Sequence, residues 1–124
     1  MSEPAPRRLP ATCWPGIVRF YEKLVHTHGF DLEPMVTLVR RIASSPSAIS
    51  VYPSTSHEAL GLSRVEHSAE RLENPMVQVS FDRPTRAFHV AFQDKQGRTV
   101  REEARADVLA VASWNEILTW LGVR

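Results

Sequence analysis

Apolar and polar residues alternate strictly along two stretches near the middle of the chain. The apolar positions are Val77, Val79 and Phe81 in the first stretch and Phe88, Val90 and Phe92 in the second. Alternation with a period of two predicts a β-strand with one buried and one solvated face. A further turn and strand follow, so residues 77–106 are predicted to form three consecutive antiparallel strands that share one apolar face.

The turns between these strands predict their pairing. The segment from Asp94 to Gly97 favours a three-residue loop that ends with Gly97 in the left-handed region. An earlier four-residue loop, residues 82–85, pairs Val79 with Phe88. The pairs expected after the second loop are Asp94 with Arg98, Phe92 with Val100, Phe88 with Ala104, and His89 with Glu103 on the polar face.

Three helices are predicted around the sheet. The first runs from Pro15, which suits a first helical turn, to Gly29. The second follows Asp31 as N-cap and ends near residue 43, forming a helical hairpin with the first. Near the C-terminus, Ser113 and Glu116 match a capping box, and Gly122 ends that helix. Residues 1–13 are rich in proline and are predicted to be a disordered tail.

The segment between the hairpin and the sheet is harder to interpret. Residues 48–52 resemble a short strand that stops at Pro53, and residues 54–58 are either a loop or the start of a short helix. Residues 59–65 are interpreted as a strand, whereas residues 66–74 fit a short helix or part of a hairpin.

The economical arrangement of these elements is a two-layer α+β sandwich. The helical hairpin and the C-terminal helix pack on one face of an antiparallel meander sheet of four to five strands. Residues 14–124 then form a single domain. The core expected between the layers joins two sets of residues: Val79, Phe81, Phe88, Val90, Phe92 and Val100 from the sheet, and Tyr21, Leu24, Val36, Val39, Leu118 and Leu121 from the helices.

Composition excludes several classes of protein. With 15 basic and 14 acidic residues, no strong field attracts nucleic acid or an anionic membrane. The single cysteine, Cys13, rules out an intrachain disulfide and a multi-cysteine zinc site. No apolar run reaches the length of a membrane span, and residues 1–10 contain no hydrophobic signal core. We therefore expect a soluble, cytoplasmic protein.

No motif for catalysis or cofactor binding is present, so we assign no catalytic residue, no metal ligand and no cofactor. His26 and His28 are two residues apart and would diverge by about 200° on a helix, which does not suit one metal ion. A small enzyme or ligand-binding protein remains the alternative. It would use His57, Glu58 or His67 in a pocket between helices and sheet.

The polar face of the predicted sheet is the favoured functional surface. Mixed charges on a rigid platform suit a protein partner, because complementary charge determines the choice of partner. In outline the chain resembles bacterial immunity or antitoxin-type inhibitors, which implies a non-enzymatic module that binds one macromolecule, such as a toxin or enzyme. A homodimer through the edge strand 48–52 is a further hypothesis. The predicted partner-binding residues are Gln78, His89, Arg101, Glu103, Arg105 and, as an anchor, Trp120.

Overall fold

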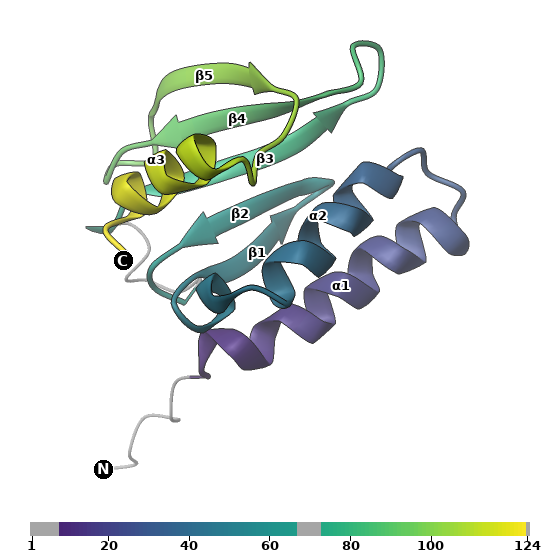
Figure 1. The fold of residues 1–124 in the computed structure, drawn as a ribbon, viewed down its shortest axis with the longest axis horizontal. Helices are drawn as coiled ribbons and strands as arrows, with labels where there is room; N and C mark the ends of the chain where they lie inside the picture. The colour runs from purple at the N-terminus through teal and green to yellow at the C-terminus, as the bar shows by residue number, and fades with distance from the viewer. Residues whose placement is uncertain (1–7, 67–72, 124) are drawn as a thin grey trace.

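A computed structural model of the chain describes residues 8–66 and 73–123, and its ribbon is shown in Figure 1. Two helices come first, then a five-stranded sheet, then a third helix. The elements in chain order are α1 (Pro10–His26), α2 (Glu33–Ala43), the short 3₁₀ helix η1 (Pro46–Ile49), β1 (Tyr52–Ser56), β2 (Ala59–Ser63), β3 (Met76–Asp82), β4 (Ala87–Gln93), β5 (Thr99–Arg105) and α3 (Val111–Leu121).

The sheet is an antiparallel meander in which every strand pairs with its neighbour in the sequence, in the order β1-β2-β3-β4-β5. The predicted α+β class and meander are confirmed. In Figure 1, α1 and α2 lie side by side as a hairpin near β1 and β2, and α3 lies apart from them against β3. None of the described helices is long and apolar enough to span a bilayer.

The core lies between the helices and one face of the sheet. Cross-strand pairs on that face are apolar: Leu62 opposite Val77, and Val77 opposite Phe92 in turn. These side chains are fully buried, together with Tyr21 of α1 and Ile117 of α3. The apolar residues that alternate through residues 77–92 therefore face the helices, as predicted.

The pairing of β3 with β4 differs from the predicted register by two residues. Val79 lies opposite Val90, not Phe88, because the four-residue loop begins at Arg83. Arg86 adopts a left-handed φ of 58° in this loop, and its guanidinium stacks over the ring of Phe81 at 4.7 Å. A shift of two residues keeps every side chain on its expected face, so the core is preserved.

The pairing of β5 is where the prediction fails most. The loop itself is as expected, since the amide of Asp94 donates to the carbonyl of Arg98 and Gly97 has a φ of 79°. Immediately afterwards a β-bulge leaves Val100 without an opposite residue, so that Arg101 lies opposite Phe92. One extra residue reverses the faces of the rest of the strand. Val100, expected in the core, is 54% exposed.

The helix boundaries also differ from expectation. Helix α1 begins at Pro10, so residues 10–13 are helical and Pro15 lies inside the helix. Trp14 is buried, and its indole N–H donates to the carbonyl of Val51 at 3.0 Å, which anchors this early turn. The N-cap of α2 is Leu32, because the carboxylate of Asp31 instead accepts a hydrogen bond from Arg86.

The first strand lies later than predicted. Residues 46–49 form η1, and the strand is Tyr52–Ser56, which contains Pro53. Proline is tolerated there because β1 is an edge strand and one side of its backbone needs no sheet partner. The strand expected within residues 59–65 is confirmed as β2. Residues 67–72 lie outside the described part of the chain.

Helix α3 begins at Val111, before the predicted capping box, and ends as expected at Gly122 with a φ of 77°. Ser113 and Glu116 do not cap it. Both instead accept hydrogen bonds from Arg105 of β5.

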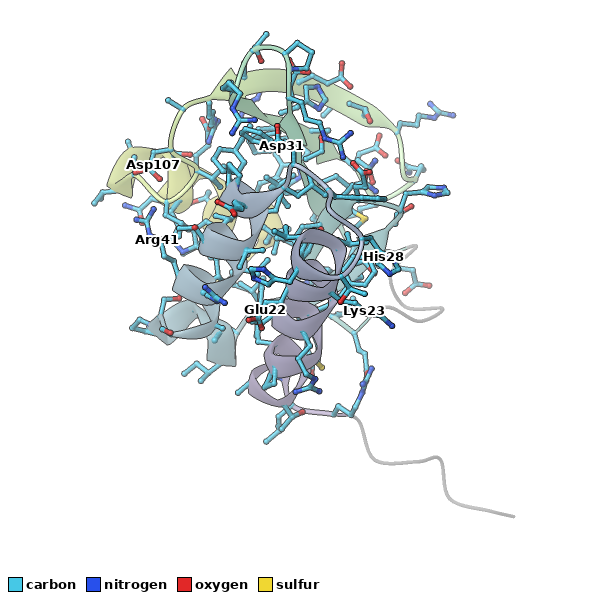
Figure 2. All side chains as sticks on the ribbon, turned by 90° about the vertical axis from the view of Figure 1, so that its right-hand side faces the viewer. Glu22, Lys23, His28, Asp31, Arg41 and Asp107 are labelled. Atoms are coloured by element: carbon cyan, nitrogen blue, oxygen red, sulfur yellow. The ribbon has the colours of Figure 1, made fainter. Side chains whose placement is uncertain are left out.

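Ion pairs join the outer sides of the helices to their neighbours. Arg40 of α2 pairs with Glu22 of α1 at 2.6 Å, and Arg41 pairs with Asp107 at 3.3 Å. Figure 2 shows Arg41 and Asp107 on adjoining elements, α2 and the connection that precedes α3. These arginines therefore connect elements in addition to opposing the dipole of α2.

Candidate functional site

The open face of the sheet, defined here as the face opposite the helices, carries His89 near the centre of its exposed part. Ser80 of β3 lies directly opposite His89, and Ala104 of β5 lies on its other side. The strands fix these positions, because residues opposite each other across a ladder point to the same face. A hydroxyl, an imidazole and a small methyl group therefore form one row across three strands.

Glu102 of β5 lies next to this row, opposite Ala91. Its carboxylate lies 3.7 Å from the Nε2 atom of His89, and the two side chains are 59% and 44% exposed. That distance is too long for a hydrogen bond, so the contact is an ion pair only when the imidazole is protonated. The pair offers a partner either a carboxylate alone or two opposite charges.

A hollow of about 320 Å³ lies beside His89 at the end of the β3–β4 hairpin. All of its lining residues belong to the β3–β4 hairpin except Ala104, which belongs to β5. Its residues are Ser80, Phe81, Asp82, Thr85, Ala87, Phe88, His89 and Ala104. Such a hollow can receive one side chain of a partner or a small ligand.

The open face is not accessible throughout, because buried residues lie on its strands β2, β3 and β4. Met76, Ser63 and Ala91 are nearly inaccessible. Gly61 is covered so closely that an added Cβ would lie 2.4 Å from the Oγ of Ser54 and 2.8 Å from the methyl group of Met76. The accessible region is therefore the one around His89, where Ser80, Glu102 and Ala104 are also accessible.

The predicted partner-binding residues are divided between the two faces, which corrects the sequence-based surface. Gln78 and His89 belong to the open face. Arg101, Glu103 and Arg105 lie on the helix side, because the bulge at Val100 reverses β5. The predicted contact of His89 with Glu103 is wrong for the same reason.

On the helix side, the charged residues of β5 form a network with α3. Arg105, whose side chain is only 12% exposed, donates to Glu103, Glu116 and the hydroxyl of Ser113. Arg101 pairs with Glu116 at 2.9 Å, and its guanidinium lies over the ring of Phe92 at 4.1 Å. The hydrogen bond from Arg105 holds the pKa of the Glu103 carboxyl below its usual value. This network attaches α3 to the sheet.

Trp120 is also engaged within the fold. Its indole N–H donates to the carbonyl of Gln93 at 3.0 Å, and its ring packs edge-on against Phe92. It is half-buried and covers the rim of the core.

The residues of the alternative pocket lie at the far end of β1 and β2. His57 is exposed in the turn between these strands and has a φ of 55°. The Glu58 carboxylate pairs with Arg83 at 3.1 Å. The backbone carbonyl of Glu58 accepts a hydrogen bond from the hydroxyl of buried Tyr21. Burial raises the pKa of Tyr21. His67 lies outside the described residues. Within residues 8–66 and 73–123, no three potential ligands are arranged to hold a metal ion.

Sequence reasoning missed Glu102. The only apolar residues of β5 are Val100 and Ala104, so its pattern is too sparse to assign faces. The consecutive charges from Arg101 to Glu103 fit either face. The sequence contained one indication of this arrangement. Ser113 and Glu116 can accept hydrogen bonds from arginine side chains as readily as from the backbone amides of a helix N-terminus.

Comparisons with protein families, curated proteins and solved structures found no match to this chain.

Proposed function

We propose that the protein is a non-enzymatic, cytoplasmic binding module that recognises one protein partner through the open face of its sheet. The observation that carries this proposal is the group of Ser80, His89 and Glu102 on neighbouring strands, which is polar, accessible and held on a rigid platform. Rigid positioning lowers the conformational entropy lost on binding. The face needs no rearrangement to present these groups.

The chemistry of the row suits a protein surface better than nucleic acid. The permanent charge beside His89 is the Glu102 carboxylate, which repels a phosphate backbone. The exposed methyl group of Ala104 and the hollow beside His89 provide space for a partner side chain. Polar groups beside a depression lined by both polar and apolar side chains resemble the mixture found in protein interfaces.

The more specific form of the proposal is an inhibitor of the immunity or antitoxin type that neutralises a toxin or enzyme. Its support is an analogy of size and architecture. The identity of the captured partner tests this narrower statement.

A small-molecule binding protein is the second candidate, and the hollow of about 320 Å³ is the observation that favours it. Pockets of roughly 300 Å³ and above are large enough for small ligands. The two candidates share His89, so the experiment must distinguish their ligands.

The test uses the wild-type chain, the site variant His89→Ala/Glu102→Ala, and the matched control His26→Ala/Glu33→Ala. The control removes the same two side-chain types from exposed positions on the helices. Each chain is immobilised and used to capture proteins from its native source, and retained proteins are quantified by mass spectrometry. The affinity of the captured protein is then measured by titration calorimetry.

We expect one protein to bind the wild type and the control equally, and to bind the site variant at least about tenfold more weakly. Equal binding to all three chains would exclude the open face. A small molecule detected on the wild type by native mass spectrometry, with no protein captured, would favour the second candidate.

A further inference from the structure

The two edges of the sheet differ in how well they are protected from pairing with another strand. β1, at one edge, has five residues, includes Pro53, and has α1 packed along it. β5, at the other edge, has seven residues and no proline, and β4 is the only described element that it contacts extensively. In Figure 1 the outer side of β5 is the outer limit of the sheet. An uncovered strand edge offers unpaired backbone donors and acceptors.

The long side chains of β5 leave this edge uncovered. Natural edge strands are commonly protected by charged side chains that extend into solvent. Here the guanidinium groups of Arg101 and Arg105 turn inward over the ring of Phe92, at 4.1 and 5.3 Å. Glu103 is attached to both arginines. The bulge at Val100 and the exposed charge of Glu102 are the remaining protective features, and the bulge leaves residues 101–105 regular.

We propose that the protein forms a two-fold dimer in which β5 pairs antiparallel with β5 of a second copy, centred on Glu102. This inference does not depend on the proposed function.

Charge complementarity selects the second copy as the occupant, and Glu102 is the centre because, as the middle residue of Thr99–Arg105, it allows the whole of β5 to pair. In this register Arg101 of each copy lies opposite Glu103 of the other, which gives two pairs of opposite charge on the helix side. Centring on Glu103 would instead place Arg101 opposite Arg105 and the two Glu103 residues together. Opposite charges across a strand pair stabilise it, and like charges destabilise it.

The exposed apolar residue at this edge also gains a contact. Val100, which is 54% exposed, falls opposite Ala104 of the second copy. The two Glu102 residues face each other on the open side, which opposes association. A single strand pair is small beside the roughly 1,200–2,000 Å² of stable interfaces, so we expect a weak, concentration-dependent dimer.

The dimer would contain one continuous ten-stranded sheet. In this register even-numbered residues of one copy lie opposite even-numbered residues of the other, and opposite residues point to the same face. The helices of both copies therefore lie on the same side of the sheet. The two open faces would then lie next to each other on the other side.

Cysteine cross-linking tests the register, in a Cys13→Ser background that removes the native thiol. Single variants are Glu102→Cys at the proposed centre, Val100→Cys and Ala104→Cys beside it, and Thr55→Cys on β1 as an edge control. Paired residues have Cα atoms about 4.5–5.5 Å apart, which a disulfide can join. Two copies of residue 100 would be about 13 Å apart along the strand and cannot be joined.

We expect Glu102→Cys to form a disulfide-linked dimer on mild oxidation, and the other three variants to remain monomeric when oxidised alone. An equal mixture of Val100→Cys and Ala104→Cys should form the mixed dimer. Cross-linking of all variants at similar rates, or preferential cross-linking of Thr55→Cys, would overturn the proposal.

Sedimentation equilibrium of the chain without added cysteines provides an independent test. We expect a dimer that Glu102→Gln tightens by up to about fivefold, because it removes the central like-charge contact. The control Glu33→Gln makes the same change in net charge on α2 and should have no effect. A monomer at every concentration up to about 1 mM would overturn the proposal.

Discussion

Replacing Arg105 by methionine tests whether β5 is attached to α3 as the structure shows. The substitution keeps an unbranched stem of similar length and removes the guanidinium. That group donates to the Ser113 hydroxyl at 2.7 Å and pairs with two carboxylates. It also lies 5.3 Å from the centre of the Phe92 ring.

The size of the effect follows from these contacts. The hydrogen bond to Ser113 is partly buried and contributes about 1 kcal/mol. The stacking on Phe92 adds about 0.5–1 kcal/mol. The paired carboxylates are 37% and 45% exposed, so solvent screens them and their contribution is small. We expect Arg105→Met to lower the free energy of unfolding by about 2 kcal/mol.

Urea denaturation followed by circular dichroism measures this change. The control is Arg19→Met, at an exposed position of α1, which should change stability by no more than about 0.5 kcal/mol. The same small change for Arg105→Met would refute the reasoning. Arg105 would then be solvated, as the sequence alone predicts.

Three further predictions concern other parts of the fold. Because the pKa of Glu103 is lowered in the fold, it stabilises the protein above the ordinary glutamate pKa, and this contribution is lost as pH falls through the lowered value. Glu103→Gln should therefore flatten the loss of stability between about pH 5 and pH 3. Tyr21→Phe removes the hydrogen bond to Glu58 and should cost about 1 kcal/mol in urea denaturation. In the wild type, the raised pKa of Tyr21 keeps its phenol neutral in the fold, whereas the phenol ionises in the unfolded chain above about pH 10. The wild type should therefore lose stability above that pH, and Tyr21→Phe should lose less. Phe92→Ala empties a fully buried site and should cost about 3–5 kcal/mol, whereas half-buried Phe88→Ala should cost about 1–2 kcal/mol.

Each of these predictions has a result that contradicts it. Parallel pH profiles for wild type and Glu103→Gln would mean that Arg105 does not perturb the carboxyl. An unchanged alkaline transition in Tyr21→Phe would mean that another group controls it. Equal losses for the two phenylalanine variants would mean that β4 is buried uniformly along its length.

Much of the architecture could be predicted because its signals are local. The alternation through β3 and β4 places Val79 and Phe92 on one face whichever register is adopted. Gly97 defines the loop before β5, since a left-handed residue is required there. The helical hairpin and the end of α3 follow from apolar periodicity and from glycine positions. β1 was misplaced because its pairing with β2 outweighs the proline that it contains.

The candidate site could be predicted only in part. His89 was correctly placed on the open face because β4 has a clear period of two. Glu102 and its charged neighbours were not, because β5 contains little apolar sequence and one extra residue exchanges its two faces.

The sequence by itself determined the three α-helices, strands β2 to β5, and which side of β3 and β4 is apolar. Only the tertiary structure decided the orientation of β5. The arginines of this strand face the helices because α3 supplies Glu116 and Ser113 to receive them, and Phe92 supplies a ring to cover. A strand with few apolar residues takes its orientation from the partners that the rest of the fold brings to it.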